Sequence, residues 1–95
     1  MKNGITEDEL WDLIGFIKIS SARFKTIMTL QNEHLMPKEI IKRTDLTPSQ
    51  VSIALKELKA KKLVKCVNEK TRKGRIYYCT EIGEKACTII EKNNK

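Results

Sequence analysis

The sequence predicts a mainly α-helical domain that carries one small β-hairpin. Apolar residues recur at helical spacing through most of the 95 residues. Two short runs rich in β-branched and aromatic residues surround a polar, Gly-containing loop near residue 70, which is typical of a hairpin. At this length we expect one domain, residues 1–95, with N-terminal helices over 6–32, two helices at a tight corner plus the hairpin over 36–80, and a last helix over 80–92.

The N-terminal part is expected to form two helices. Thr6 and Glu9 have the spacing of a capping box, so the first helix should begin there. Its apolar residues are too numerous for the roughly 100° stripe that buries one face, so part of this helix is expected to meet another subunit. Ser20 or Ser21 offers a new N-cap, for a second helix that reaches about Asn32.

Two further helices are expected at a tight corner in the middle of the chain. A minimal strand at residues 35–36 precedes Pro37, which suits the first position of a helix that continues to about Thr44. Thr47 then caps the next helix, and Gln50, three residues later, completes a second capping box.

The hairpin is expected to pair residues 63–67 with residues 75–79. This pairing places four side chains on one face, which we assign to the core: Val64 opposite Cys79, and Cys66 opposite Tyr77. Thr80 then caps a last helix that continues through Ile90.

The positive charge is concentrated in one block of the sequence. Between Lys56 and Arg75 there are nine lysines and arginines against two glutamates, which equals the net charge of +7 of the whole chain. Charge placed in this way favours a surface that faces a polyanion, of which DNA and RNA are the commonest. The alternative is a lysine-rich face that only serves solubility.

The helix that begins after Thr47 has the side chains expected of a helix that enters the major groove of DNA. Gln50 can pair with adenine, although its capping role competes with that contact. Ile53 is either an exposed contact for a thymine methyl group or a core residue. The residues expected to contact DNA from this helix are Thr47, Ser49, Gln50, Ser52, Ile53 and Lys56.

The loop of the hairpin is a second candidate contact. It is basic and contains Gly74, so it can enter a minor groove or straddle phosphates. We expect Arg72, Lys73 and Arg75 to contact nucleic acid, and the alternative is a solubilising turn.

Catalytic and metal chemistry find little support in the sequence. The cysteines, Cys66, Cys79 and Cys87, are odd in number and lack a Cys-x-x-Cys pair, so buried reduced thiols are expected, and regulation by cysteine oxidation stays open. One histidine, and no clustered carboxylates beside a plausible nucleophile, argue against an enzyme, and no cofactor, metal site or small-molecule effector is predicted. Without a long apolar run or signal peptide, the protein is expected in the cytoplasm, away from membranes.

Residues 36–83 resemble the winged helix-turn-helix domains of MarR- and ArsR-like transcriptional regulators, particularly small archaeal ones. The resemblance rests on Met36-Pro37-Lys38-Glu39-Ile40, Leu46-Thr47-Pro48-Ser49-Gln50-Val51-Ser52, Leu55-Lys56-Glu57-Leu58, Leu63-Val64, Arg72-Lys73-Gly74-Arg75-Ile76-Tyr77 and Thr80-Glu81-Ile82-Gly83. It implies a winged helix-turn-helix with extra N- and C-terminal helices that binds double-stranded DNA sequence-specifically to regulate transcription.

The resemblance also implies a homodimer whose first and last helices form the interface, which agrees with the excess of apolar residues in the first helix. The residues assigned to that interface are Leu10, Trp11, Ile14, Ile17 and Ile89. The chain lacks the cysteine pair of metal-sensing ArsR proteins and is shorter than typical ligand-binding MarR proteins. The main alternative is a winged-helix interaction module that docks on RNA or on a larger protein assembly.

Overall fold

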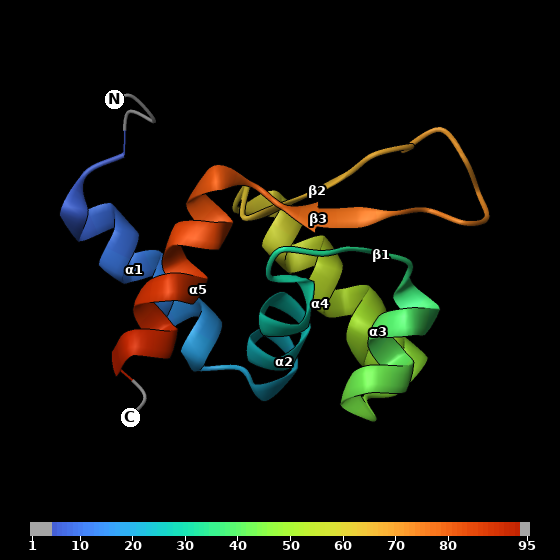
Figure 1. The fold of residues 1–95 in the computed structure, drawn as a ribbon, viewed down its shortest axis with the longest axis horizontal. Helices are drawn as coiled ribbons and strands as arrows, with labels where there is room; N and C mark the ends of the chain where they lie inside the picture. Colours follow the sequence, from blue (N-terminus) through green and yellow to red (C-terminus); the bar gives the residue numbers. More distant parts are fainter. Residues whose placement is uncertain (1–4, 94–95) are drawn as a thin grey trace.

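In the computed structural model, which describes residues 5–93, five helices pack on one side of a three-stranded antiparallel sheet (Figure 1). The elements are α1 (Glu7–Lys18), α2 (Ser21–Leu30), β1 (His34–Leu35), α3 (Pro37–Thr44), α4 (Pro48–Ala60), β2 (Val64–Cys66), β3 (Tyr77–Cys79) and α5 (Glu81–Asn93). The prediction of a mainly helical fold with a small β-hairpin is therefore confirmed.

Local capping determines where the helices begin. The Thr6 and Glu9 capping box is present, with the Glu9 amide 3.1 Å from Thr6 Oγ1 and the Thr6 amide 2.8 Å from Glu9 Oε1. Ser20, rather than Ser21, caps α2, and Thr80 caps α5. These predicted starts are confirmed. They could be predicted because a cap depends only on residues within one turn of each other.

Two boundaries near residue 33 differ from those predicted. The second helix ends at Leu30 instead of near Asn32, because Asn32 adopts a left-handed conformation with φ of 61°. The short strand covers His34 and Leu35 instead of residues 35–36, because the backbone N–H of Met36 is bonded to the Glu39 carboxylate at the start of α3.

The sheet has the order β1-β3-β2, and its hairpin has the predicted register, with Val64 opposite Cys79 and Cys66 opposite Tyr77. Three of these side chains are buried, whereas Tyr77 is half-buried. The strands are shorter than expected because the side chain of Asn68 bonds to the backbone where the ladder would continue.

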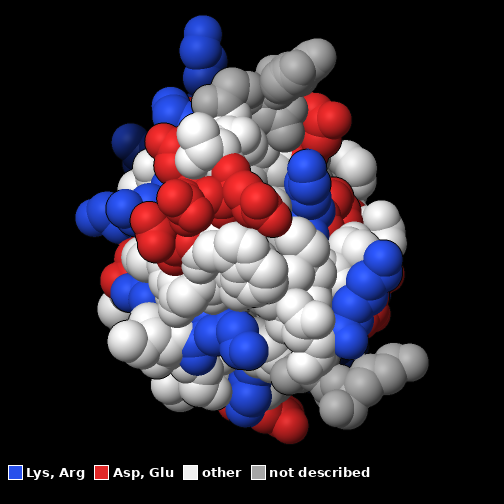
Figure 2. Space-filling model, turned by 90° about the vertical axis from the view of Figure 1, so that its left-hand side faces the viewer, with Lys and Arg blue, Asp and Glu red and all other residues white. Residues whose placement is uncertain are grey.

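The end of the molecule formed by α1 and α5 shows an area without charged residues beneath a band of acidic side chains, with lysines or arginines around it (Figure 2). The helix α1 contacts both α2 and α5. A helix packed between two others needs a wider apolar surface than one that covers a single neighbour.

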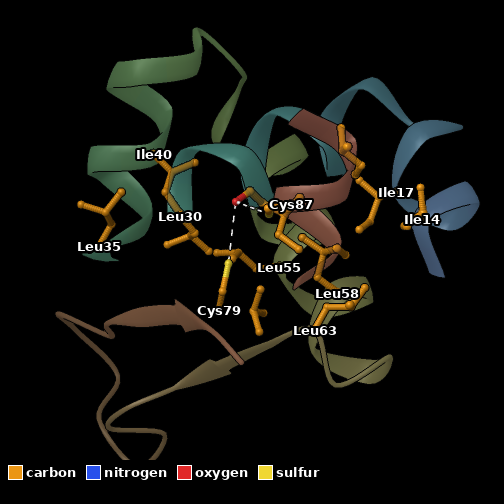
Figure 3. Close-up of a cluster of buried hydrophobic side chains, with 14 of the residues drawn as sticks. Ile14, Ile17, Leu30, Leu35, Ile40, Leu55, Leu58, Leu63, Cys79 and Cys87 are labelled. Carbon is orange, nitrogen blue, oxygen red and sulfur yellow. Dashed lines mark hydrogen bonds between the residues drawn. The ribbon is translucent and has the colours of Figure 1, made fainter. Parts of the chain in front are cut away.

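The core is one continuous cluster to which every helix and strand contributes (Figure 3). Its residues are Leu10, Ile14, Ile17, Ile27, Leu30, Leu35, Ile40, Leu46, Val51, Leu55, Leu58, Leu63, Val64, Cys79, Ala86, Cys87 and Ile90.

The cysteines belong to this buried interior and are free thiols. The thiols of Cys79 and Cys87 both lie against the carbonyl oxygen of Ile27, at 3.8 and 3.7 Å (Figure 3). Interaction with Cys87, together with burial, raises the pKa of the Cys79 thiol far above its ordinary value. A thiol that stays protonated is a poor nucleophile, so Cys79 acts here as a packing residue.

Candidate nucleic-acid interface

Three segments converge on one side of the molecule: the N-terminal turns of α3 and α4, and the loop between β2 and β3, residues 67–76, which we call the wing. Between them lies a groove of about 300 Å³, which we call the wing groove. It is lined by Pro37, Ile41, Pro48, Ser52, Leu55, Arg72, Gly74, Arg75 and Tyr77. Both predicted contact segments therefore border one space.

The helix α4 buries one face and exposes the face predicted to contact DNA. Val51, Ala54, Leu55 and Leu58 are buried. The exposed residues are Thr47, Ser49, Gln50, Ser52, Ile53 and Lys56. Ile53 is 54% exposed, so the alternative of a core residue is wrong for this position. An exposed apolar side chain beside small polar ones is suited to contact with a thymine methyl group.

Gln50 is engaged in the cap of α4. Its side-chain Oε1 accepts a hydrogen bond from the backbone amide of Thr47 at 2.9 Å, and the backbone amide of Gln50 donates to Thr47 Oγ1 at 3.1 Å. A bidentate contact with adenine uses both amide atoms of the side chain, so it would have to break this cap.

The shape of the wing is set by Asn68. Its Oδ1 accepts from the Ile76 amide at 2.9 Å, and its Nδ2 donates to the Gly74 carbonyl oxygen at 3.0 Å. Gly74 has φ of +70°, a conformation that favours glycine. Arg75 donates from Nε to the Thr71 carbonyl oxygen at 2.6 Å, which leaves its two Nη groups as outward donors.

Arg72 and Lys73 lie exposed at the tip of the wing, and Arg75 is exposed beside the groove. None of these three cations is in an ion pair with an acid of the described residues 5–93. The wing therefore presents cations that are available to an external anion.

The basic block of the sequence does not form one surface. Glu57 pairs with Arg23 of α2 at 2.9 Å, and Lys59 pairs with Glu69 at 3.1 Å. Lys61 and Lys62 follow the C-terminal end of α4, about 20 Å from its N-terminal turn for 13 residues at 1.5 Å each. The structure therefore corrects the simple interpretation of the charge block: only part of it borders the wing groove.

Two lysines that sequence reasoning did not select lie beside the groove. Lys38 and Lys42 are exposed on α3, whose residues Pro37 and Ile41 line the groove. Their spacing of four residues places them on one face of α3, and this was the signal available in the sequence. The first helix of a helix-turn-helix crosses the DNA backbone, which makes both lysines candidate phosphate contacts.

The predicted subunit interface needs a correction. Leu10, Ile14 and Ile17 are buried in the core of the chain itself, which leaves at most 6% of each residue exposed to a partner. Their burial follows from the packing of α1 between α2 and α5. Trp11 remains 47% exposed and Ile89 half-buried, and both line a shallow depression with Ile5, Thr6, Glu7, Leu10 and Lys85. Ile19, which was not selected, is 82% exposed.

Across residues 5–93, no helix is both long and apolar enough to cross a lipid bilayer. Within the same part of the chain, no group of three or more His, Cys, Asp or Glu side chains is arranged to hold a metal ion.

Comparison with solved structures identifies the fold as a winged helix-turn-helix. TubR from Bacillus thuringiensis serovar israelensis, solved bound to 24 bp of tubC, matches with a TM-score of 0.76 and 10% sequence identity, over 87% of this chain and 92% of TubR. The adhesin competence repressor AdcR from Streptococcus pyogenes matches with a TM-score of 0.69 and 15% identity, over 96% and 74% of the two chains. Reduced HlyU from Vibrio cholerae matches with a TM-score of 0.65 and 18% identity, over 96% and 100%.

At sequence identities of 10%, 15% and 18%, the structural likeness to these proteins establishes the fold alone. No family model and no curated protein matches the sequence. The three solved structures come from bacteria, so the archaeal part of the resemblance stays a prediction.

Proposed function

We propose that this protein is a DNA-binding transcription regulator that recognises a specific double-stranded sequence as a homodimer in the cytoplasm, and that it acts by binding rather than by catalysis. One observation carries the proposal: the exposed polar face of α4 and the arginines of the wing border one groove. The fold supports it, because TubR, with the same fold, was solved bound to 24 bp of tubC.

In this proposal α4 enters the major groove and the remaining contacts hold the backbone. Ser49, Ser52 and Ile53 present two hydroxyls and one apolar side chain to base edges. Pro48 has no amide hydrogen and the Gln50 amide is bonded to Thr47, so the Ser49 amide is the donor of this first turn that can bind a phosphate. Arg72 and Arg75 bind phosphates or the adjacent minor groove, and the lysines of α3 extend the backbone contact.

Binding to duplex DNA across a salt series tests this function. Sequences selected from a random duplex pool should bind with an affinity that falls as salt rises, with a slope of log K against log salt of about −0.9 for each phosphate contacted. Fluorescence anisotropy from about 50 to 200 mM salt measures the slope. Undetectable binding at low salt, or an affinity that does not change with salt, would contradict the proposal.

Duplex RNA of the selected sequence separates this function from the rival of an RNA-docking module. The major groove of A-form RNA is too narrow and deep for an α-helix, so the duplex RNA should bind more weakly than the DNA. Equal or tighter binding to the RNA would favour the rival.

The homodimer is proposed to form through the exposed area around Trp11 and Ile89. A two-fold dimer would place two copies of α4 about 34 Å apart, in successive major grooves of a palindromic site. Light scattering at micromolar concentration should give twice the 11.0 kDa mass of one chain.

A Trp11→Glu variant should lower the mass to that of one chain, because a carboxylate on this face cannot be buried between subunits without a large desolvation penalty. Val67→Glu is the matched control, since Val67 is comparably exposed, at 56%, and lies in the wing. A parent protein with the mass of one chain, or a Trp11→Glu variant with the mass of two, would refute this interface.

A further inference from the structure

A second cavity lies at the end of α4 opposite the wing groove. It has a volume of about 360 Å³ and is formed by α1, the corner after α4, and α5. Its lining residues are Ile5, Glu9, Asp12, Leu13, Phe16, Lys61, Lys62 and Ile82. We propose that this cavity binds a small zwitterion with an apolar body, namely a free L-amino acid with an apolar side chain.

The walls of the cavity carry opposite charges. Glu9 and Asp12, three residues apart, stand on α1, and Lys61 and Lys62 stand on the corner after α4. Within residues 5–93 no ion pair joins these acids to these lysines. Glu9 Oε1 is bonded to the Thr6 amide, so the Asp12 carboxylate and Glu9 Oε2 are the acceptors for a ligand ammonium group on one side, and the lysine ammonium groups can bind a ligand carboxylate on the other.

The floor of the cavity is apolar. Leu13, Phe16 and Ile82 supply it, and the Phe16 ring has Lys61 Nζ at 5.4 Å from its centroid. The volume is at the small end of ligand cavities, which suits a molecule the size of one amino acid. An apolar side chain on this floor would direct its α-amino and α-carboxylate groups to the two charged walls.

The backbone of Lys62 has an unusual conformation for a lysine. Within residues 5–93, three residues other than glycine have positive φ: Asn32, Asp45 and Lys62. Asparagine and aspartate tolerate this conformation, whereas lysine does not benefit from it. The position follows the end of α4, where glycine is the usual residue.

Lys62 is nevertheless held firmly there. Its amide donates to the Lys59 carbonyl oxygen at 2.9 Å, and its own carbonyl oxygen accepts from Thr80 Oγ1 at 2.8 Å. The long, positively charged side chain of Lys62 therefore lies beside the cavity, at a position where the backbone conformation favours glycine. The Leu63 amide also donates to the Leu58 carbonyl oxygen at 3.0 Å, so this conformation belongs to the ordinary end of α4, and the Lys62 ammonium beside the cavity is the group that would bind the ligand carboxylate.

The Lys62→Gly variant separates an effect on binding from an effect on stability, because it should lower the affinity for the ligand while it raises the melting temperature. Removal of the left-handed strain should raise the melting temperature by about 2–5 °C. Loss of the charge-assisted contact should lower the affinity for L-leucine or L-phenylalanine by about tenfold. Lys25→Ala, which removes an equal charge from the exposed side of α2, should leave that affinity unchanged.

Isothermal titration calorimetry on the whole chain without DNA measures this binding, so its outcome is separate from that of the DNA experiments. The probes are L-leucine, L-phenylalanine, and two leucine analogues that lack one charge, 4-methylpentanoate and isoamylamine. Tighter binding of the amino acids than of both analogues supports the proposal. The proposal is overturned if no amino acid binds at about 10 mM, if an analogue binds as tightly as leucine, or if Lys62→Gly binds leucine as the parent does.

Discussion

Replacement of Gly83 by alanine is expected to lower the free energy of unfolding by about 3 kcal/mol or more, at the upper end of what overpacking costs. A Cβ at this position would overlap the backbone carbonyl oxygen of Leu63 and lie 3.3 Å from the Cβ of Cys79. That carbonyl oxygen also accepts from the Thr80 amide at 3.0 Å and from Thr80 Oγ1 at 3.2 Å. The backbone of Leu63 cannot move away without loss of these two hydrogen bonds to Thr80, the residue that caps α5, so any shift that relieves the overlap is costly.

Gly15→Ala is the matched control for this variant. Gly15 is an exposed residue of α1, and a Cβ there meets no atom within 4 Å. Because glycine is unfavourable inside a helix, this substitution should raise the free energy of unfolding by about 0.5–1 kcal/mol. Urea denaturation of the two variants should therefore give changes of opposite sign. A loss of less than about 1 kcal/mol for Gly83→Ala would show that α5 does not approach the backbone of Leu63 this closely.

The parts of the fold that could be predicted from the sequence are those determined over a few residues. Thr6 with Glu9 and Thr47 with Gln50 cap their helices as expected, since each pair is three residues apart. The register of β2 and β3 was predictable for a related reason. Alternate side chains must share one face, so the buried Val64 and Cys66 determine which residues of the partner strand face the core.

The predictions that needed correction depend on which elements pack together. Ile14 and Ile17 were assigned to a partner subunit because nothing in the sequence tells that α1 has two neighbours within its own chain. Likewise, the basic block is contiguous in sequence, yet Lys61 and Lys62 lie at the C-terminal end of α4, whereas Arg72 and Arg75 border the wing groove beside its N-terminal turn. For the candidate site, the residues of α4 and the wing were predictable from their polarity and charge. The contribution of α3 was not, because it depends on how α3 meets the wing.

Removal of both wing arginines is expected to weaken DNA binding in a way that does not depend on sequence. Arg72→Ala with Arg75→Ala should flatten the slope of log K against log salt by about one to two units, because two phosphate contacts are lost. Affinity should fall by similar factors on selected and unrelated duplexes. Lys18→Ala with Lys25→Ala removes the same charge from exposed positions of α1 and α2, and should leave the slope near that of the parent. Equal slopes for the wing variant and the parent would exclude the wing from phosphate contact.

The single variant Arg75→Lys decides how Arg75 contributes. Arg75 Nε shapes the wing through its bond to the Thr71 carbonyl oxygen, and its charge also faces outward. Lysine keeps the charge but lacks the donor geometry of Nε, so it removes the internal bond while it retains the attraction to phosphate. A salt slope equal to that of the parent with reduced affinity would mean that Arg75 mainly holds the wing in shape. An affinity of Arg75→Lys equal to that of the parent would mean that only the charge of Arg75 is needed. The Arg72→Ala, Arg75→Ala double variant would then measure the loss of phosphate contacts directly. Because Arg72 is exposed at the tip, the difference between the salt slopes of Arg72→Ala and of the double variant gives the contribution of Arg75.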